Sequence, residues 1–563
     1  MVFFSRKSLK SKRGGEIYPD EIFLDSSNLP DFDTQQFEGR IEKPISKKAI
    51  FSLGFFFVCI LFIFSFKLFI LQIKEGNQYL IRGEDNRLEH SVIFSERGIV
   101  YDKKDVELIW NTFDEEEPYA IRNYIEKDGL AHLLGYVSYP LEDSSGNFYQ
   151  IETIGKDGVE NYFNSKIKGE NGLKIIEVDA LQNIKSESVI KPPKNGENIT
   201  LTIDSELQSH LYSFIKNLSK DVGFKGGAGV IMNIKNGEIL AMSSYPEYNS
   251  NILSNSGDKN EIANYIGNKN NPFLNRVTSG LYTPGSIVKP FMALGALTEG
   301  VITPDKQILS TGSISLPNPY YPELKSVFKD WKVHGWVDMR RALAVSSDVY
   351  FYEIGGGFEG QKGIGILKIN EYMKMFGFEQ VTGGEVIDEQ KGVIPNPEWK
   401  KEMFDGEEWT VGNTYHTVIG QYGFQVTPLQ VVRAVSALAN NGIMLTPVIT
   451  ASSTKNVGLS KTMPIDDKSF EIVKEGMRDA VTEGTAQGLN VGFIKIGAKT
   501  GTAELGVSKK YVNSWVVGFF PYDNPKYAFA VIMEEGPKEN TIGGLYVMRQ
   551  LLEWMNINRP EYF

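Results

Sequence analysis

One segment near the N-terminus is more apolar than any other part of the chain. Residues 49–73 carry no charged side chain before Lys67, and at about 1.5 Å per residue a helix of this length crosses a hydrocarbon core about 30 Å thick. The run is longer than the apolar core of a cleaved signal peptide, and no small-residue cleavage site follows it. A buried helix of a soluble protein is rarely apolar on every face. The pattern therefore predicts an uncleaved, single-span membrane anchor.

The residues around this anchor predict its orientation. Basic side chains mark the cytoplasmic side of a membrane span, and four of them precede the run closely: Arg40, Lys43, Lys47 and Lys48. Residues 1–48 are polar and mixed in charge, which predicts a short, disordered cytoplasmic tail. We therefore expect the chain beyond residue 73 to lie on the other side of the membrane.

The segment 74–198 is charged and contains short strand-like runs. Residues 97–111 alternate between apolar and polar positions, which predicts a half-buried pair of strands. Residues 155–172 predict a helix bounded by glycines. A turn-rich joint follows, made of Pro192, Pro193, Asn195 and Gly196. We expect a domain boundary there, near residue 198.

The segment 199–563 mixes strands and helices. A strand is expected to end at Asp204 or Ser205 and to lead into a helix, and 227–246 predicts a hairpin of two apolar strands. The spacing over 433–440 predicts an amphipathic helix. Near the C-terminus, 514–536 predicts a strand, a turn and a second strand. Strands at both ends with helices between them indicate an α+β domain, an antiparallel sheet flanked by helices.

Composition and charge narrow the possible functions. The 563 residues are 41% apolar and 23% charged, which excludes a wholly disordered, collagenous or multi-span membrane protein. The net charge of -11 argues against a nucleic-acid-binding protein, which typically carries an excess of basic residues. The single cysteine, Cys59, lies in the predicted anchor. An intramolecular disulfide and a zinc site with two or four cysteines are therefore excluded.

The first motif that carries chemistry is S-x-x-K, at Ser286 and Lys289. Serine is a weak nucleophile and needs a base within hydrogen-bond reach. A lysine can be that base only when it is neutral, which burial and a second positive charge favour. We expect Ser286 to cap the following helix and Lys289 to project from the same face. Alone, the motif is common by chance and is more typical of a capped helix with a surface lysine.

Two more motifs follow. Ser346 and Asp348 stand two residues apart at an expected helix start or loop, where they could relay a proton and bind a substrate amide. The strand-like segment at Lys499, Thr500, Gly501 and Thr502 presents an ammonium group and a hydroxyl to a substrate carboxylate. Gly501 lets another group approach the backbone closely, and the N–H of Thr502 could face a developing oxyanion. Alone, the first of these also fits a helix cap and the second a solvated strand end.

The order of the motifs is more specific than any one of them. S-x-x-K, S-x-[ND] about 60 residues later and K-T-G about 150 further on form the set of serine acyl-transfer enzymes that bind penicillin. Of the five histidines, only His334 lies between the first two motifs. A Ser-His-Asp triad stays possible, but no G-x-S-x-G turn surrounds a candidate serine.

With these motifs the chain resembles the class B penicillin-binding proteins, monofunctional peptidoglycan D,D-transpeptidases, from the span almost to the C-terminus. Further matching stretches are RGIVYDKKDVELIWN, GKDGVENYFNSKIKGENG, NRVTSGLYTPGSIVKP and VIGQYGFQVTPLQ. The resemblance implies a serine β-lactamase-like transpeptidase domain and an extended N-terminal pedestal of the dimerisation type. The expected domains are the cytoplasmic tail (1–48), the anchor (49–73), the pedestal (74–198) and the transpeptidase domain (199–563).

Within the family, the stretch FKDWKVHGWVDMRRALAVSSDVYFY looks most like penicillin-binding protein 2, the cell-elongation type. Asp348 in place of the commoner Asn also fits that type. The alternatives are a division-specific transpeptidase, a β-lactam-hydrolysing or β-lactam-sensing protein of the same superfold, and an inactive scaffold of the elongation machinery.

The resemblance implies a role for each motif residue and requires no cofactor. Lys289 takes the proton of Ser286, whose oxygen attacks the penultimate D-Ala of a stem pentapeptide. The N–H groups of Ser286 and Thr502 stabilise the oxyanion. The terminal D-Ala leaves, protonated through Ser346, and an amine of a neighbouring stem forms the cross-link; D,D-carboxypeptidase activity would be a side reaction. The expected substrate-binding residues are Ser346, Asp348, Lys499, Thr500 and Thr502.

The implied partners are the stem pentapeptide, β-lactams as inhibitors, and a RodA-like glycosyltransferase of the SEDS type within the elongation complex. The implied location is the bacterial plasma membrane. Some elongation-type relatives hold a metal near the histidine before the second motif, but the cysteine ligand would fall near Leu343, so we expect no metal and a structural role for His334. Two departures put loop geometry in doubt: Lys103, Lys104 and Asp105 replace an R-N-G turn, and Tyr422 replaces a glycine, whose role Gly423 could assume.

Overall fold

The computed structural model describes residues 46–85, 88–144, 147–178, 184–255, 257–318, 321, 323–451, 461–506, 508–540 and 542–563. The predicted cytoplasmic tail therefore lies outside the described residues, apart from 46–48. The chain divides into two compact units. The first comprises Met1–Glu89 and Glu177–Ile184, and the second comprises His90–Ile176 and Lys185–Phe563.

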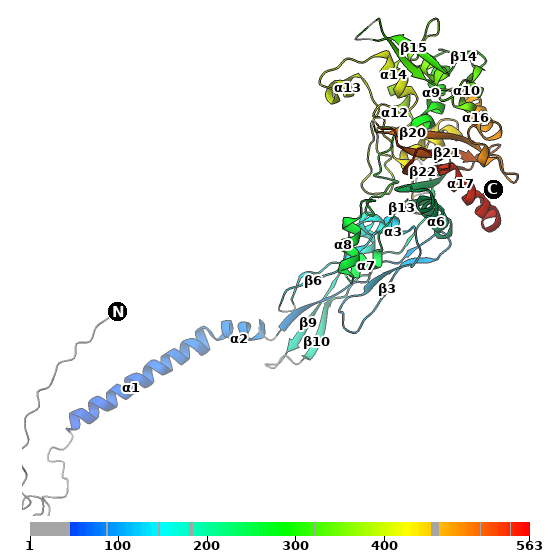
Figure 1. Ribbon diagram of the computed structural model, residues 1–563. Coiled ribbons are helices and arrows are strands. Elements are labelled where there is room, and N and C mark those ends of the chain that lie inside the picture. The colour runs from blue at the N-terminus through cyan, green and yellow to red at the C-terminus, as the bar shows by residue number, and fades with distance from the viewer. Residues whose placement is uncertain are drawn as a thin grey trace, which may run out of the picture. The chain divides into compact units, whose positions relative to one another are not determined.

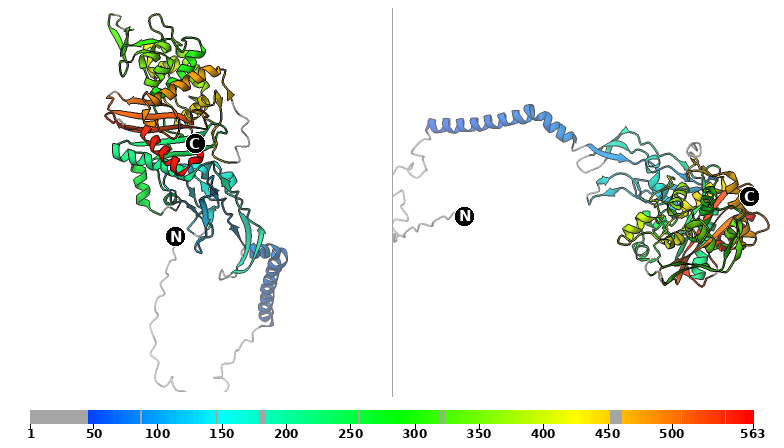
Figure 2. Two further views of the ribbon diagram at one scale, coloured as in Figure 1. Left: turned by 90° about the vertical axis from the view of Figure 1, so that its right-hand side faces the viewer. Right: turned by 90° about the horizontal axis from the view of Figure 1, so that it is seen from above.

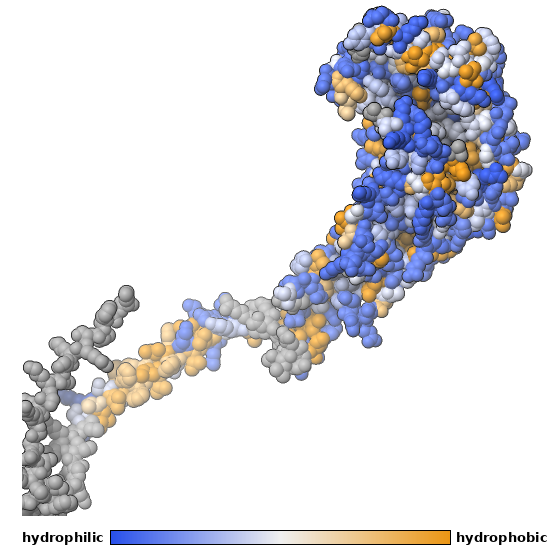
Figure 3. Space-filling view, viewed as in Figure 1, coloured by the Kyte–Doolittle hydropathy of each residue, from blue (hydrophilic) through white to orange (hydrophobic). Residues whose placement is uncertain are grey.

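The first unit contains the predicted membrane-spanning segment as one long helix. Helix α1 (Lys47–Phe69) continues through a π-helical turn (Ile70–Lys74), and helix α2 (Gly76–Asp85) follows. Ser46 caps α1, because its Oγ accepts a hydrogen bond of 3.1 Å from the N–H of Ala49. No side chain of α1 is buried, and Figure 3 shows apolar side chains along its length. The helix is long and apolar enough to cross a membrane, as predicted.

The second unit begins with short strands. Strands β2 (Val100–Tyr101) and β3 (Glu107–Thr112) are antiparallel, which confirms the strand pair predicted over 97–111. They belong to a sheet of order β11-β2-β3-β4, with β4 (Ile121–Tyr124) and β11 (Ile199–Thr200). A second sheet has the order β1-β9-β10 and consists of β1 (Leu88–Ile93), β9 (Gly172–Val178) and β10 (Ile184–Lys191). The small elements between them are α3 (Ala131–Leu134), β5 (Val137–Ser138), β6 (Leu141–Glu142), β7 (Phe148–Gln150) and β8 (Ile154–Gly155).

The helix predicted over 155–172 is two short helices instead, α4 (Gly158–Tyr162) and α5 (Asn164–Ile167). The break falls at Phe163, whose backbone is not helical and whose ring is buried. Glu160 of α4 is fully buried and binds two arginines: Arg122 Nε donates to its Oε1 over 2.7 Å, and Arg97 Nε donates to its Oε2 over 2.9 Å. Glu160 thus connects α4 to strand β4, which contains Arg122, and to the segment before β2, which contains Arg97.

The turn at Lys103, Lys104 and Asp105 is stabilised by hydrogen bonds to the side chain of the preceding residue, Asp102. Asp105 has a φ of +60°, a left-handed conformation that Asp tolerates better than most residues. Asp102 Oδ1 accepts hydrogen bonds from the N–H groups of Lys104 and Val106. Lys104 Nζ also lies 3.2 Å from the buried carboxylate of Asp204. The turn therefore packs on the domain that follows.

The main sheet of the second unit has the order β13-β12-β22-β21-β20, with every neighbouring pair antiparallel. Strands β12 (Gly226–Asn233) and β13 (Ile239–Tyr245) form the hairpin predicted over 227–246. Strands β21 (Tyr511–Phe520) and β22 (Tyr527–Pro537) confirm the strand, turn and strand predicted near the C-terminus. Strand β20 (Gly497–Leu505) forms the edge and contains the third motif. The predicted α+β architecture is confirmed (Figure 1).

Helices cover both faces of this sheet, because alternate residues of each strand point to opposite sides. Val230 and Met232 pack into one core, whereas Ile231 packs into the other. The second core contains α6 (Ser205–Val222) and α17 (Gly544–Asn558), and Figure 2 shows α17, in red, against the sheet. Asp204 caps α6, so the strand predicted to end at Asp204 ends earlier, at Thr200.

The first core contains α15 (Pro428–Ala439), α16 (Asp467–Thr482) and the helices near the site. The helix predicted over 433–440 is confirmed as part of α15, which begins earlier, at Pro428. Every residue of α15 except Arg433 is buried between the sheet and other elements, so little of the helix faces solvent. The other elements between β13 and β20 are α7 (Ser250–Asn255), α8 (Lys259–Gly267), α9 (Lys289–Thr298), β14 (Ile308–Ser310), β15 (Ser313–Pro317), β16 (Lys325–Lys329), β17 (Gly335–Val337), α10 (Met339–Val345), α11 (Asp348–Gly356), α12 (Ile366–Met375), α13 (Pro397–Met403), α14 (Val411–Val418), β18 (Ile443–Met444) and β19 (Lys461–Thr462).

Candidate active site

Ser286 lies in a tight turn at the start of a buried helix. A 3-10 helix (Gly285–Val288) precedes α9, and Gly285 enters it with a φ of +58°. The expectation that Ser286 caps the helix is wrong: Pro284 occupies the cap position, and Ser286 is the second residue of the turn. The helical geometry begins earlier than predicted because Pro284 and Gly285 already bend the chain. The hydroxyl of Ser286 therefore caps no helix, and Ser286 lines a cleft.

Lys289 follows one 3-10 turn later, so that it lies on the same side of the turn as Ser286. Its side chain is fully buried, which excludes the alternative of a surface lysine. Its Nζ donates to Ser346 O over 2.8 Å and to Ser346 Oγ over 3.3 Å, and it lies 2.6 Å from Asp348 Oδ1. The amine thus contacts the second motif in this conformation, rather than the hydroxyl of Ser286.

The second motif forms a sharp corner between two helices. Ser346 ends α10 with φ +60° and ψ +40°, a left-handed conformation, and Asp348 is the first residue of α11. Ser347 between them caps α11 by accepting a hydrogen bond from the N–H of Tyr350. The corner turns Ser346 and Asp348 toward Lys289. The helix-cap interpretation of the motif is therefore correct for Ser347, while its two neighbours face the lysine.

The third motif lies on edge strand β20. Lys499 is fully buried, and its Nζ donates to Ser346 Oγ over 2.8 Å and to Thr500 O over 2.9 Å. This excludes the alternative of a solvated strand end. A Cβ added at Gly501 would lie 2.8 Å from Ile287 Cγ2 and 2.9 Å from Pro284 O. Only glycine therefore lets the strand approach the turn of Ser286 this closely, as predicted for this position.

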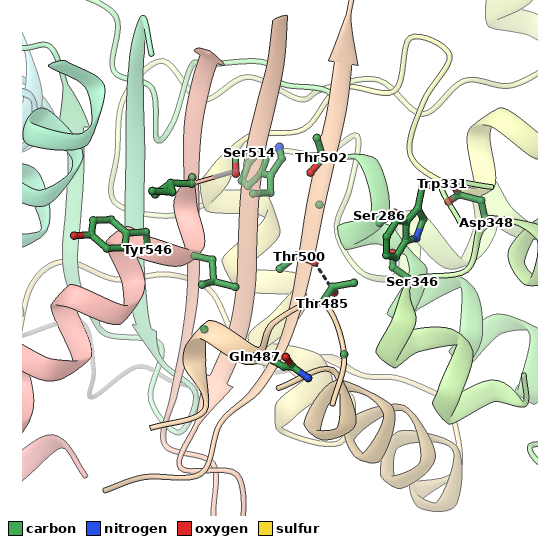
Figure 4. Close-up of a pocket in the computed structure, with 17 residues that line it drawn as sticks. Ser286, Trp331, Ser346, Asp348, Thr485, Gln487, Thr500, Thr502, Ser514 and Tyr546 are labelled. Atoms are coloured by element: carbon green, nitrogen blue, oxygen red, sulfur yellow. Dashed lines mark hydrogen bonds between the residues drawn. The ribbon is translucent and has the colours of Figure 1, made fainter. Parts of the chain in front are cut away.

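The three motifs surround one cleft with a volume of about 660 Å³. Figure 4 shows Ser286 and Ser346 facing the strand that bears Thr500 and Thr502. Lys289 and Lys499 lie buried behind this surface and meet at Ser346. The lining residues are Ser286, Trp331, Ser346, Asp348, Gly484, Thr485, Gln487, Gly488, Thr500, Gly501, Thr502, Ser514, Trp515, Ile542, Gly543, Leu545 and Tyr546.

The charged groups of the site perturb one another. Burial, together with the neighbouring charge of Lys289, lowers the pKa of Lys499 well below its ordinary value. Burial also raises the pKa of Asp348, and this effect outweighs the attraction of Lys289. Two amines and one carboxyl group therefore share a site where two full positive charges are unfavourable. The surroundings therefore favour the neutral form of Lys499, which can accept a proton.

The structure adds cleft residues that sequence reasoning missed. Thr485 Oγ1 lies 2.6 Å from Thr500 Oγ1, which Figure 4 marks as a hydrogen bond. The indole Nε1 of Trp331 donates to Val345 O over 3.2 Å. Gln487 and Tyr546 line the end of the cleft away from Ser286. Thr485 lies in the short stretch EGTA at 483–486, which also resembles the family pattern and could have indicated it, but nothing in the sequence pointed to the others.

The backbone at Tyr422 is left-handed, as expected where the family pattern has a glycine. Tyr422 has a φ of +63°, and Gly423 a φ of +80°. The ring of Tyr422 stacks on Phe404 and meets Trp399 edge-on, which offsets the strain of a left-handed residue. Gly420 O accepts a hydrogen bond of 2.9 Å from Gly285 N, so this loop supports the turn of the candidate nucleophile.

His334 lies close to the second motif and contacts Asp330 and Trp331. Its Nε2 is 3.4 Å from Asp330 Oδ1, and its ring meets Trp331 edge-on. Leu343, where a cysteine ligand would be expected, is fully buried in the core. Among the described residues no group of three or more His, Cys, Asp or Glu side chains could hold a metal ion. The structural role of His334 stays a prediction.

Comparison with known proteins agrees with this site. Residues 227–550 match the model of the penicillin binding protein transpeptidase domain, and residues 115–201 match that of the penicillin-binding protein dimerisation domain. The peptidoglycan D,D-transpeptidase MrdA of Haemophilus influenzae is 31% identical over 459 residues, which are 75% of this chain and 67% of that protein.

Solved structures show the same fold. The structure of Pseudomonas aeruginosa PBP2 in complex with WCK 5153 superimposes with a TM-score of 0.68 at 28% identity, over 83% of this chain and 97% of that one. Helicobacter pylori PBP2, in its complex with MreC, gives a TM-score of 0.69 at 25% identity, over 84% and 99%. The chain therefore belongs to the penicillin-binding protein transpeptidase family, in the class B group that contains PBP2.

Proposed function

We propose that this protein is a membrane-anchored peptidoglycan D,D-transpeptidase of cell elongation, which cross-links stem peptides through an acyl-enzyme on Ser286. The observation that carries the proposal is the convergence of Lys289 and Lys499 on Ser346 Oγ, behind a cleft that Ser286 lines. The MrdA and PBP2 relatives support the elongation type. Asp348 in the second motif agrees with that type.

The acylation step needs a neutral amine near Ser286. In the free enzyme Lys289 is paired with Asp348, whereas the lowered pKa of Lys499 favours its neutral form. A substrate carboxylate bound by Thr500 and Thr502 would favour the ammonium form of Lys499. Ser346, which contacts both amines, can carry a proton from Lys289 to Lys499. Lys289 is then neutral and can turn toward Ser286, because catalytic hydrogen bonds are often long in free enzymes.

The later steps use the same groups. The Ser286 oxygen attacks the carbonyl of the penultimate D-Ala, and the N–H groups of Ser286 and Thr502 stabilise the oxyanion. The proton taken by Lys289 passes through Ser346 to the leaving D-Ala amine. An amine from a second stem then attacks the ester, the Ser286 oxygen regains a proton, and the cross-link forms. Water in place of that amine would give D,D-carboxypeptidase activity.

The anchor and the relatives support a location and partners. A helix of this length and apolar character suits a single span, and basic residues before it favour a cytoplasmic N-terminus. The catalytic domain would then lie outside the bacterial plasma membrane, near lipid-linked substrate. The Helicobacter pylori relative was solved with MreC. By likeness, we assign this chain to an elongation complex with a SEDS-type glycosyltransferase.

The test is covalent labelling by a fluorescent penicillin, whose carbonyl stands in for the D-Ala-D-Ala amide. The wild-type chain in detergent should be labelled, Ser286→Ala should not, and Ser279→Ala, a serine outside the cleft, should be labelled normally. Lys499→Ala should slow labelling by at least about 100-fold with little change in folding, because the amine that takes the proton from Lys289 through Ser346, and its positive charge behind the bound carboxylate, are lost. Persistent labelling of Ser286→Ala would reject Ser286 as the nucleophile, and normal labelling of Lys499→Ala would reject the role of Lys499 in acylation.

A further inference from the structure

Asp330, which the mechanism above does not use, sits directly behind the second motif. It follows strand β16, and its side chain is fully buried. Its Oδ2 accepts hydrogen bonds from Ser347 Oγ over 2.8 Å, from Val349 N over 3.1 Å and from Ser310 Oγ over 3.0 Å. Its Oδ1 accepts one from Trp331 N over 2.8 Å. One carboxylate thus joins β14, the start of α11 and the cleft wall.

These contacts hold the corner at Ser346 from both sides. Ser347 and Val349 flank Asp348, so the carboxylate of Asp330 secures the first turn of the helix that presents Asp348 to Lys289. On the other side, Trp331 lines the cleft, and its Nε1 donates to Val345 O, on the last residue of α10. The short segment of Asp330 and Trp331 therefore touches the helix before the corner and the helix after it.

The corner needs such support because its geometry is demanding. Ser346 holds a left-handed backbone conformation that residues other than glycine rarely adopt. Its hydroxyl must also stay within reach of two buried amines, at 3.3 and 2.8 Å. Although burial alone would raise the pKa of Asp330, hydrogen bonds from Val349 N and Ser347 lower it below its ordinary value. The group therefore accepts these hydrogen bonds as a carboxylate at neutral pH.

We propose that Asp330 is a positioning residue for acylation, which fixes the corner between α10 and α11 so that Ser346 and Asp348 stay in contact with Lys289 and Lys499. The inference rests on the proposed function, because acylation is the step affected. A merely structural Asp330 would lower stability without changing the reaction of the folded protein. The two roles therefore differ in the rate constant of acylation at a temperature where every variant is folded.

The test compares Asp330→Asn with Glu385→Gln in the full-length chain in detergent. Glu385 is a matched control, because its carboxylate also accepts several hydrogen bonds, from the N–H groups of Ile449 and Thr450 and from Thr450 Oγ1, but lines no part of the cleft. A chromogenic β-lactam gives the dissociation constant of the non-covalent complex and the acylation rate constant separately. Hydrogen–deuterium exchange at 346–350 reports the corner itself.

Asp330→Asn should slow acylation by about 10- to 100-fold, the effect of misplacing catalytic groups by about an ångström, with an unchanged dissociation constant. It should also speed exchange at 346–350. Glu385→Gln should change neither quantity. Ser347→Ala removes the hydrogen bond from Ser347 Oγ to Asp330 and should slow acylation in the same way. This variant replaces Asp330→Asn in the test if Asp330→Asn does not fold.

Acylation of folded Asp330→Asn at the wild-type rate, or equal slowing by Glu385→Gln, would overturn the positioning role. Unchanged exchange at 346–350 would overturn it as well. The exchange measurement needs no acylation, so it tests whether Asp330 supports the corner even if the wild-type chain is not labelled. Absence of labelling of the wild-type chain would instead reject the proposed function.

Discussion

Replacing Gly501 with alanine should separate the nucleophile from the strand that binds the substrate. The added Cβ would lie 2.8 Å from Ile287 Cγ2, 2.9 Å from Pro284 O and 3.3 Å from Ile287 N. Carbon atoms in contact are about 3.5 Å or more apart, so the turn must retreat by about 0.7 Å. Ser286 lies between Pro284 and Ile287, and its oxygen moves with them.

The size of the effect follows from this displacement. Overpacking of a well-packed site costs about 1–3 kcal/mol in the free energy of unfolding. A nucleophile misplaced by a large fraction of an ångström loses roughly 10- to 100-fold in rate. Gly501→Ala should therefore unfold at a lower temperature and acylate a fluorescent penicillin at least about tenfold more slowly while still folded. Thermal unfolding and rapid-mixing kinetics measure the two quantities.

Gly497→Ala provides the control on the same strand. Its Cβ would meet the ring of Phe519 at 2.6 Å, an equally tight contact that does not involve the turn of Ser286. It should lower stability by a similar amount and leave acylation unchanged. Wild-type acylation by Gly501→Ala would refute the argument that this contact places the nucleophile. Equal slowing by both variants would show that general distortion of the sheet is responsible.

Two further predictions concern the rest of the second unit. Glu160→Gln removes a fully buried charge that pairs with Arg97 and Arg122, so it should lower the free energy of unfolding by about 3–5 kcal/mol; a denaturant curve equal to that of the wild type would contradict this. Burial raises the pKa of Asp204, but hydrogen bonds from Arg559 and from Leu207 N outweigh it, and the pKa is lowered. Its stabilisation is then complete above its unfolded pKa of about 3.9 and is lost as the pH falls through the folded value. The difference in unfolding free energy between the wild type and Asp204→Asn should therefore be constant near neutral pH and shrink below about pH 4; a difference that grows on acidification would contradict this sign.

Local patterns predicted the elements whose formation depends on nearby residues. The apolar run of the anchor, the hairpin over 227–246 and the last two strands of the sheet were all recognisable, because alternation and turn residues act within a few positions. The helix over 155–172 was less predictable, since the break at Phe163 depends on a buried ring and on the Glu160 cluster. The burial of α15 on all sides is likewise a property of its neighbours.

For the active site, the order of residues along the chain already shows which side chains are available: two serines, two lysines, a carboxylate and a glycine in a recognised order. The folded chain brings Lys289 and Lys499 together at Ser346, places Ser286 within a 3-10 turn, and lets Asp330 accept hydrogen bonds from the start of α11. These contacts join positions far apart in the chain. They form through packing and the exclusion of water, which no local pattern encodes.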